Sequence, residues 1–224
     1  SFLDMRNRID RQIEQRTLML SGVSHDLRTP LTRLKLGLSL SEQDAEAKAM
    51  IRDVDDMEQM LQEFLAFARG DSTESTEKTD PIALAQKMVA DTKRAEGDID
   101  LVITGEPAKP LFVAMRPNAM RRALDNLVTN GLRYGSKCRL TVCIMDDAIL
   151  YVVEDNGPGI PADQREKAMR PFERLDVARN QNHGTGVGLG LAIAMDITSS
   201  HGGVLELSDS DELGGLKVEL RLPR

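Results

Sequence analysis

The sequence predicts an α + α/β protein in which a helical hairpin forms a dimeric four-helix bundle and an α/β sandwich domain follows it. Three observations support this fold class. Apolar residues recur every three or four positions over residues 1–69, which is the period of a helix packed on one side. A polar segment without periodicity then spans 71–80. From residue 81 onward, short strand-like runs alternate with amphipathic helical stretches, as in a sheet covered by helices on one face.

Residues 21–70 are expected to form two long antiparallel helices. The first helix has apolar residues at Leu20, Val23, Leu27, Leu31, Leu34 and Leu38, and the second has them at Met50, Val54, Met57, Leu61, Phe64 and Ala68. The alternating steps of four and three residues are typical of a helical bundle. Ser41–Asp44, between the two series, is typical of a turn with a new helix cap. Because a lone hairpin leaves half of its apolar stripe exposed, we expect two copies to pair as a homodimer.

Residues 71–80 are expected to be a linker because they are polar and lack periodicity, and residues 81–224 are expected to be a second domain. In this domain helices are predicted over 81–94, 117–133 and 188–200, and strands over 99–104, 111–115, 139–145, 149–154, 203–208 and 216–222. His201 follows the last predicted helix, where capping of the helix end is its simplest role.

The composition argues against several classes of function. Hydrophobic residues make up 41% of the chain and charged residues 29%, as in soluble globular proteins. The net charge of −7 argues against nucleic acid as the main partner. Cys138 and Cys143 fall on opposite faces of one predicted strand, so no disulfide is expected, in agreement with a reducing cytoplasm. No apolar run approaches the roughly 18 residues that span a bilayer, and Arg6 and Arg8 argue against a signal peptide.

One histidine stands out in the first predicted helix. His25 falls about 140° from the apolar stripe on a helical wheel, so its imidazole is expected to face solvent. The carboxylate of Asp26 can fix the tautomer by accepting from one ring N–H, which leaves the other nitrogen free to attack. Thr29 lies one turn further along the same side, and Pro30 bends the helix there. These neighbours suggest a phosphoryl acceptor, and a solvated surface histidine is the plain alternative.

Three further segments together suggest a nucleotide site. The first has Asn126, Asn130, Arg133 and Tyr134, the second has Asp155, Gly157 and Gly159, and the third has Gly186, Gly188, Leu189, Gly190 and Leu191. Asn126 and Asn130 share a helix face, where amide oxygens can hold Mg²⁺ beside phosphate oxygens. The carboxylate of Asp155 ends a strand and can accept from an exocyclic amine, and the glycine run opens a helix whose N–H groups can bind an anion. Each segment alone also has a plain explanation, such as helix-surface asparagines or a strand-ending turn.

In this order, the motifs resemble those of the sensor histidine kinases of two-component systems, and among them the EnvZ-like osmosensors. Residues 24–34 resemble the H box, Asn126–Asn130 the N box, Asp155–Gly159 the G1 box, Pro171–Phe172 the F box and Gly186–Leu191 the G2 box. The resemblance covers nearly the whole chain. Residues 1–20 resemble the end of a HAMP signal-relay helix. This implies that the chain is the cytoplasmic portion of a bacterial inner-membrane sensor.

The resemblance implies a Bergerat-type ATP-binding α/β sandwich and the activity of a protein-histidine kinase. By this resemblance, Asp155 would bind the adenine amino group. Asn130, helped by Asn126, would hold Mg²⁺. Arg133 and the helix start at Gly188–Leu191 would neutralise the phosphates.

The resemblance also implies a reaction sequence on the hairpin. His25 would take the phosphoryl group from Mg-ATP, with Asp26 as orienter or general base. The group would then pass to an aspartate in the receiver domain of a response regulator, OmpR-like by the same resemblance. Thr29 would position a water that hydrolyses the regulator's acyl phosphate, so the enzyme would also be a phosphatase.

Two departures from the family pattern and two alternative functions accompany this interpretation. Gly131 stands where the family usually has alanine, which would loosen the helix by roughly 1 kcal/mol. Gly184 and Thr185 precede the usual glycine run in a segment, 171–187, that is typical of a mobile lid. The first alternative is an ATP-driven conformational machine of the gyrase, MutL or heat-shock chaperone type, although Asn126 stands where such machines carry a base. The second is a dimeric scaffold that binds ATP without kinase activity.

Overall fold

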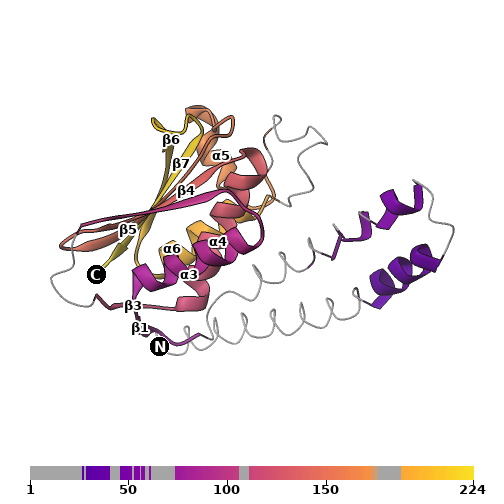
Figure 1. Cartoon of the computed structure of the whole chain (residues 1–224), viewed down its shortest axis with the longest axis horizontal. Helices are drawn as coiled ribbons and strands as arrows, with labels where there is room; N and C mark the ends of the chain where they lie inside the picture. The colour runs from indigo at the N-terminus through magenta and orange to yellow at the C-terminus, as the bar shows by residue number, and fades with distance from the viewer. Residues whose placement is uncertain are drawn as a thin grey trace, which may run out of the picture. The chain divides into compact units, whose positions relative to one another are not determined.

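The computed structural model describes residues 27, 29–40, 46–51, 53–55, 57–58, 61, 74–105, 111–173, 175 and 188–224. The chain divides into two compact units (Figure 1), the first ending at residue 72 and the second beginning at residue 73. In the part of the chain that the structure describes, no helix is both long and apolar enough to cross a membrane.

The first unit contains the two helices predicted from the apolar periodicity. One spans 29–40, and the described residues of the other, between 46 and 61, are helical as well. An ion pair between Lys35 and Asp55 joins the two helices. The turn expected at 41–44 lies outside the described residues.

The apolar stripe of this hairpin divides into two sets. Leu31, Ala47 and Val54 are buried, whereas Leu27, Leu34, Met50 and Met57 are 45–55% exposed. Members of each set recur at seven-residue intervals, the repeat of a helical bundle. The exposed set is therefore the half of the stripe that one hairpin leaves uncovered.

The second unit is a mixed sheet with helices on one face (Figure 1). Its helices are α3 (Pro81–Arg94), α4 (Pro117–Tyr134), α5 (Arg165–Ala168) and α6 (Gly190–Ser200), with a 3-10 turn, η1, at Ala162–Gln164. Its strands are β1 (Glu77–Thr79), β2 (Ile99–Thr104), β3 (Val113–Met115), β4 (Cys138–Ile144), β5 (Ala148–Asp155), β6 (Val204–Asp209) and β7 (Leu216–Pro223). The large sheet has the order β2-β4-β5-β7-β6, with β2 and β4 parallel and the other pairs antiparallel. This architecture confirms the predicted α/β sandwich.

The structure corrects the predicted elements in three places. Residues Glu77–Thr79, expected within a linker, form β1 and pair with β3. Backbone pairing needs no apolar side chains, so this polar strand left no hydropathy signal. The strand expected from residue 111 begins at Val113, and the helix expected from residue 188 begins at Gly190. Gly188 has φ = +76°, which lies outside the right-handed helical region.

Local signals explain why α3 begins where the sequence predicts. The side chain of Asp80 accepts hydrogen bonds from the N–H groups of Ile82 (2.9 Å) and Ala83 (3.1 Å), and Pro81 occupies the first turn. Tyr151, a fully buried residue of β5, donates its hydroxyl to the carbonyl of Pro81 over 3.2 Å. The start of α3 is therefore fixed both locally and by the sheet.

The N-terminus of α4 is capped by residues distant in the sequence. The carboxylate of Glu74 accepts from the N–H of Asn118 (2.8 Å) and of Ala119 (2.9 Å). Nε2 of His201, just after α6, accepts from the N–H of Arg116 (3.0 Å), so Nδ1 carries the proton and donates to the carbonyl of Ile197 (2.7 Å). His201 therefore ties the end of α6 to the start of α4, which confirms a capping role.

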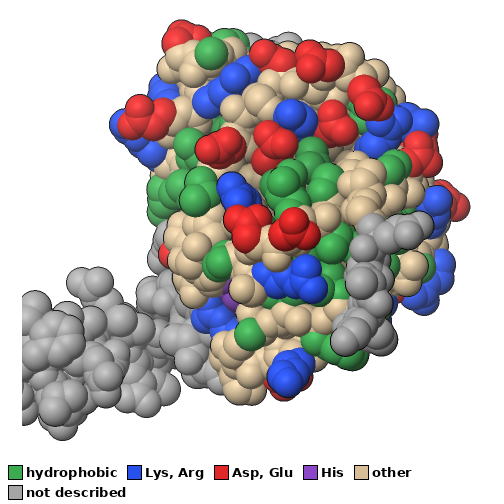
Figure 2. Space-filling model, turned by 90° about the vertical axis from the view of Figure 1, so that its left-hand side faces the viewer, with side chains coloured by type: hydrophobic (Ala, Val, Ile, Leu, Met, Phe, Trp, Pro, Cys, Tyr) green, Lys and Arg blue, Asp and Glu red, His purple; other side chains and the backbone are tan. Residues whose placement is uncertain are grey.

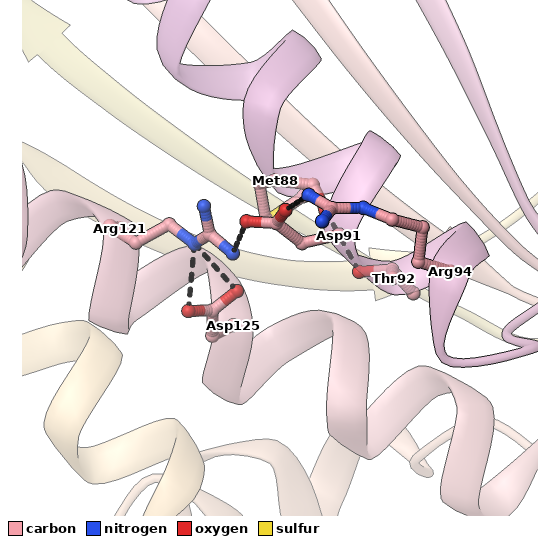
Figure 3. Close-up of polar contacts among 6 residues, drawn as sticks. All are labelled: Met88, Asp91, Thr92, Arg94, Arg121 and Asp125. Carbon is pink, nitrogen blue, oxygen red and sulfur yellow. Dashed lines mark hydrogen bonds and ion pairs between the residues drawn. The ribbon is translucent and has the colours of Figure 1, made fainter.

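An arginine on α4 links α4 to α3 (Figure 3). Arg121 donates from Nη2 to Asp91 (2.8 Å) and from Nε to both oxygens of Asp125 (3.0 and 2.9 Å). Arg94 forms a second ion pair with Asp91. The hydrogen bond from Arg121 lowers the pKa of Asp91 below its usual value.

The face of the sheet opposite the helices carries a row of alternating charges. Because Leu140 and its even-numbered neighbours in β4 are buried, the odd-numbered positions of β4 face away from the helices. In this row Asp100, Arg139, Glu154 and Lys217 follow one another across four strands. Figure 2, which shows the left-hand side of the molecule as seen in Figure 1, has hydrophobic side chains bordered by acidic and basic ones. This arrangement is typical of a sheet with one solvated face.

Candidate nucleotide-binding site

Asp155, at the end of β5, is the centre of the site. Its side chain is only 7% exposed, and Oδ1 accepts from the N–H groups of Gly157 (2.8 Å) and Leu216 (3.2 Å). Burial raises the pKa of this carboxyl, and the two backbone donors oppose the rise. Because Oδ1 accepts from two backbone N–H groups, the carboxylate is fixed in direction.

Two glycines allow backbone segments to approach Asp155 closely. An added Cβ on Gly131 of α4 would lie 3.2 Å from Sγ of Cys138 and 3.3 Å from Cβ of Asp155. An added Cβ on Gly215 would collide with Oδ1 of Asp155 and lie 2.5 Å from the nitrogen of Gly157. Gly131 therefore does more than loosen its helix, because it lets α4 pack directly against β4 and β5.

The thiol of Cys138, near the carboxylate of Asp155, stays protonated. Burial and the nearby Asp155 raise the pKa of Cys138 to about 12. Cys138 is buried and Cys143 is half-buried, and both are free thiols on opposite faces of β4, as the sequence predicts.

The predicted side chains of α4 lie on one half-buried face of that helix. Asn126, Asn130, Arg133 and Tyr134 are each neither buried nor fully exposed, while Leu127 and Val128 between them belong to the core. An added Cβ on Gly190, the first residue of α6, would lie only 2.7 Å from Nδ2 of Asn130. The structure therefore brings the N box and the start of α6 into contact.

The beginning of α6 has no hydrogen bond from the side chain of its N-cap residue. Its N-cap residue, Leu189, is buried and has no side-chain acceptor for the N–H groups of the first turn. Gly188 precedes it, and Leu191 of the first turn is half-buried. The N–H groups of a helix's first turn and the positive end of its dipole favour an anion such as phosphate.

The two ends of the predicted lid are held together. The N–H of Phe172 donates to the carbonyl of Gly188 over 3.0 Å, and Phe172 has φ = +65°. Apart from residue 175, residues 174–187 lie outside the described part of the chain, and Gly186 is among them.

Of the site residues predicted in the hairpin, only some lie in the described part of the chain. Thr29 lies in the described part of the first helix and is exposed. His25 and Asp26 lie outside the described residues.

Sequence reasoning missed the part of the site contributed by the β6–β7 turn. The N–H of Gly215 donates to the backbone carbonyl of Asp155 over 3.0 Å, and the N–H of the next residue, Leu216, donates to Oδ1 of its carboxylate. The adjacent glycines Gly214 and Gly215 were a turn signal, but only the pairing of β5 with β7 brings them to Asp155.

Comparison with known families first defines the class of the second unit. Residues 115–224 match the family described as "Histidine kinase-, DNA gyrase B-, and HSP90-like ATPase". This range contains the Asn130, Asp155 and Gly190 positions, and it identifies the second unit as an ATPase-like domain of this class. Residues 15–73 match the "His Kinase A (phospho-acceptor) domain".

Similar proteins define the family more closely. The chain is 37% identical over 225 residues to the sensor histidine kinase GtrS of Pseudomonas aeruginosa, with 100% of this chain and 45% of GtrS covered. It is 33% identical over 234 residues to the sensor protein RstB of Escherichia coli, with 100% of this chain and 52% of RstB covered. The crystal structure of full-length ShkA in complex with AMPPNP has the same fold, with a TM-score of 0.69 and 23% identity over 92% of this chain and 45% of ShkA. The two family matches and these relatives together show a histidine kinase, and the chain spans about half the length of the curated relatives it matches.

Proposed function

We propose that this chain transfers the γ-phosphoryl group of ATP to His25 and passes it on to an aspartate of a response regulator. The observation that carries the proposal is the buried, doubly anchored carboxylate of Asp155 in a chain that also has a phosphoacceptor domain. A carboxylate fixed in this way discriminates for a ligand amine, as adenine recognition requires.

Each part of the nucleotide would have its own residues. Oδ2 of Asp155 accepts from the adenine amino group, and Asn130, helped by Asn126, holds Mg²⁺. The open start of α6 at Gly190 and the guanidinium of Arg133 neutralise the phosphates, with Tyr134 beside them on α4. The proximity of Gly190 to Asn130 supports this assignment, because a side-chain amide whose oxygen can ligate Mg²⁺ then lies next to a helix start that can bind phosphate. Bound Mg²⁺ would neutralise charge that develops on the phosphate oxygens.

The histidine would act as a nucleophile. Asp26 accepts from one ring N–H of His25, and the other nitrogen attacks the γ-phosphorus. A P–N bond forms, the bond to the β–γ bridging oxygen breaks, and ADP leaves. The regulator's carboxylate then attacks the same phosphorus, which breaks the P–N bond and frees the imidazole. In the dephosphorylation of the regulator, Thr29 orients a water molecule toward the regulator's acyl phosphate.

The hairpin would dimerise through its uncovered apolar set. Leu27, Leu34, Met50 and Met57 repeat at seven-residue spacing, and a second copy offers an identical stripe for them to pack against. The partner regulator is OmpR-like and the parent an EnvZ-like inner-membrane osmosensor with a HAMP relay, as the resemblance of the motifs implies.

Labelled ATP tests the proposal against both alternatives. After incubation with γ-labelled ATP and Mg²⁺, acid-labile and base-stable label on the wild-type chain, absent from His25→Gln and Asp155→Asn, supports the kinase. Rapid release of free phosphate without label would instead identify an ATPase machine. If the chain shows neither label nor phosphate release, the scaffold alternative is supported.

The phosphatase part needs its own variant. Thr29→Ala should keep autophosphorylation while losing dephosphorylation of the phosphorylated regulator. Unchanged dephosphorylation by Thr29→Ala would contradict this role.

A further inference from the structure

Arg165, the first residue of α5, joins two segments that are distant in the sequence. Its Nε donates to the carbonyl of Ile160 (3.0 Å), and its Nη2 donates to Oδ1 of Asp209 (2.6 Å). A longer contact of 3.5 Å runs from Nη1 to the carbonyl of Leu207. The Arg165 side chain is 19% exposed and its bonds to the two carbonyls are partly buried, whereas the Asp209 side chain is 74% exposed and the ion pair faces solvent. The planar guanidinium is the side chain that can serve acceptors in several directions at once.

The two joined segments are those that hold Asp155. From the loop that ends at Ile160, the N–H of Gly157 donates to Oδ1 of Asp155. From the turn that begins after Asp209, the N–H of Leu216 donates to the same oxygen.

The loop and the turn also touch one another directly. Gly159 has φ = +68°, and an added Cβ there would lie 3.6 Å from the carbonyl group of Gly215. The chain from Asp155 to Ile160, the side chain of Arg165, and the chain from Asp209 to Leu216 therefore form a closed ring around the carboxylate.

We propose that Arg165 is a positioning residue for base recognition, which acts by fixing the spacing of the loop and the turn and hence the direction of Asp155. The proposal rests on the proposed function, in which Asp155 accepts from the adenine amino group. Arg165 has no contact with the carboxylate itself among its hydrogen bonds to described residues, so its effect passes through Ile160 and Asp209. The loop contains two glycines and has little intrinsic stiffness, which is why an external tie matters.

A purely structural role makes a different prediction from a positioning role. If Arg165 only stabilised the fold, its loss would lower the melting temperature, but the folded molecules would bind ATP as before. If Arg165 positions Asp155, folded molecules bind the nucleoside part more weakly. The phosphate side of the site, at Asn130 and Gly190, belongs to α4 and α6 and would be spared.

Calorimetric titration with ATP, adenosine and inorganic tripolyphosphate separates the two roles. For Arg165→Met, measured well below its melting temperature, we expect the Kd of ATP and of adenosine to rise about tenfold, as for one lost charge-assisted hydrogen bond. The Kd of tripolyphosphate should stay within about twofold of wild type. For Arg165→Lys the Kd of adenosine should lie between those of wild type and Arg165→Met, because an ammonium group can pair with Asp209 but cannot also reach both carbonyls.

A matched control is Arg221→Met. Arg221 also pairs with an exposed aspartate, Asp147, over 2.7 Å, but it lies on β7 opposite Leu150, away from Asp155. The Arg221→Met variant should bind ATP, adenosine and tripolyphosphate as tightly as wild type does. Should Arg165→Met not fold, Asp209→Asn keeps the arginine and removes its charged partner, and the Kd of adenosine should then rise about threefold.

The outcomes distinguish this proposal from the proposed function. If Asp155→Asn loses adenosine but folded Arg165→Met and Asp209→Asn bind adenosine as tightly as wild type, the role of Arg165 is refuted alone. If Arg165→Met loses tripolyphosphate as much as adenosine, the role is refuted too, because the damage is general. If wild type and Asp155→Asn bind adenosine equally, both the proposed function and the role of Arg165 fall.

Discussion

Replacing Gly190 with alanine should disable phosphoryl transfer while leaving the fold intact. The added Cβ would lie 2.7 Å from Nδ2 of Asn130 and 3.4 Å from its Cγ and Oδ1. Ordinary contacts of this kind begin near 3.5 Å, so the amide must retreat by roughly 0.5–1 Å. Mg²⁺ demands near-ideal geometry at about 2.1 Å from each ligand, so a displacement of this size removes the amide from the metal.

The expected magnitude follows from the size of that displacement. A misplacement of about 1 Å costs on the order of a hundredfold in rate. The free energy of unfolding should change little, because the strain opposes a gain of up to about 1 kcal/mol from replacing a helical glycine.

The assay is the initial rate of His25 labelling from γ-labelled ATP across a range of Mg²⁺ concentrations. Gly37→Ala is the matched control, because Gly37 is also helical and an added Cβ there meets nothing within 4 Å. The control should keep its rate. A Gly190→Ala protein that labels at the wild-type rate with the wild-type dependence on Mg²⁺ would refute the reasoning.

Three further predictions concern stability. Glu74→Ala removes the cap of α4 and should lower the free energy of unfolding by about 1 kcal/mol in urea titrations, whereas exposed Glu77→Ala should not. Because the pKa of Asp155 is raised above its ordinary 3.8, its contribution to stability is present below pH 3.8 and lost as pH rises through the folded pKa. Asp155→Asn should therefore stabilise the ligand-free chain at pH 7 relative to wild type, an advantage that disappears at low pH. The pKa of Asp91 is lowered instead, so Asp91→Asn should destabilise at pH 7, and its difference from wild type should shrink as pH falls below 3.8.

Local sequence signals were sufficient where a helix or strand carries its own boundary markers. The bounds of α3 were predicted at both ends, because a capping aspartate, a first-turn proline and an apolar period all lie within Asp80–Arg94. The edge strand β2 was also predicted at both ends. In contrast, β1 is polar and exists through its pairing with β3, some 36 residues away, which no local pattern records.

The spacing of residues within the motifs also predicted which residues form the candidate site, but not the hydrogen bonds that fix their side chains. The N-box and G1-box positions were identified because short motifs place amides and a carboxylate at the end of a helix face or a strand. The backbone donor that fixes Asp155 and the carboxylate acceptor that caps α4 were not identified, since Leu216 lies 61 residues from Asp155 and Glu74 lies 44 residues from Asn118. Gly131 was interpreted as a weak point of its helix, whereas the structure places it against Cys138 and Asp155.

The sequence by itself predicted the two-part architecture, the apolar stripes and the candidate site residues. These features depend on periodicity and on residue type within a few turns of chain. Only the tertiary structure decided the spacing of the loop at Gly157, the turn at Gly215 and the arginine at position 165 around one carboxylate. The physical reason is that hydrogen bonds between distant segments form after the sheet has assembled its strands out of sequence order, and that order is not encoded in any local pattern.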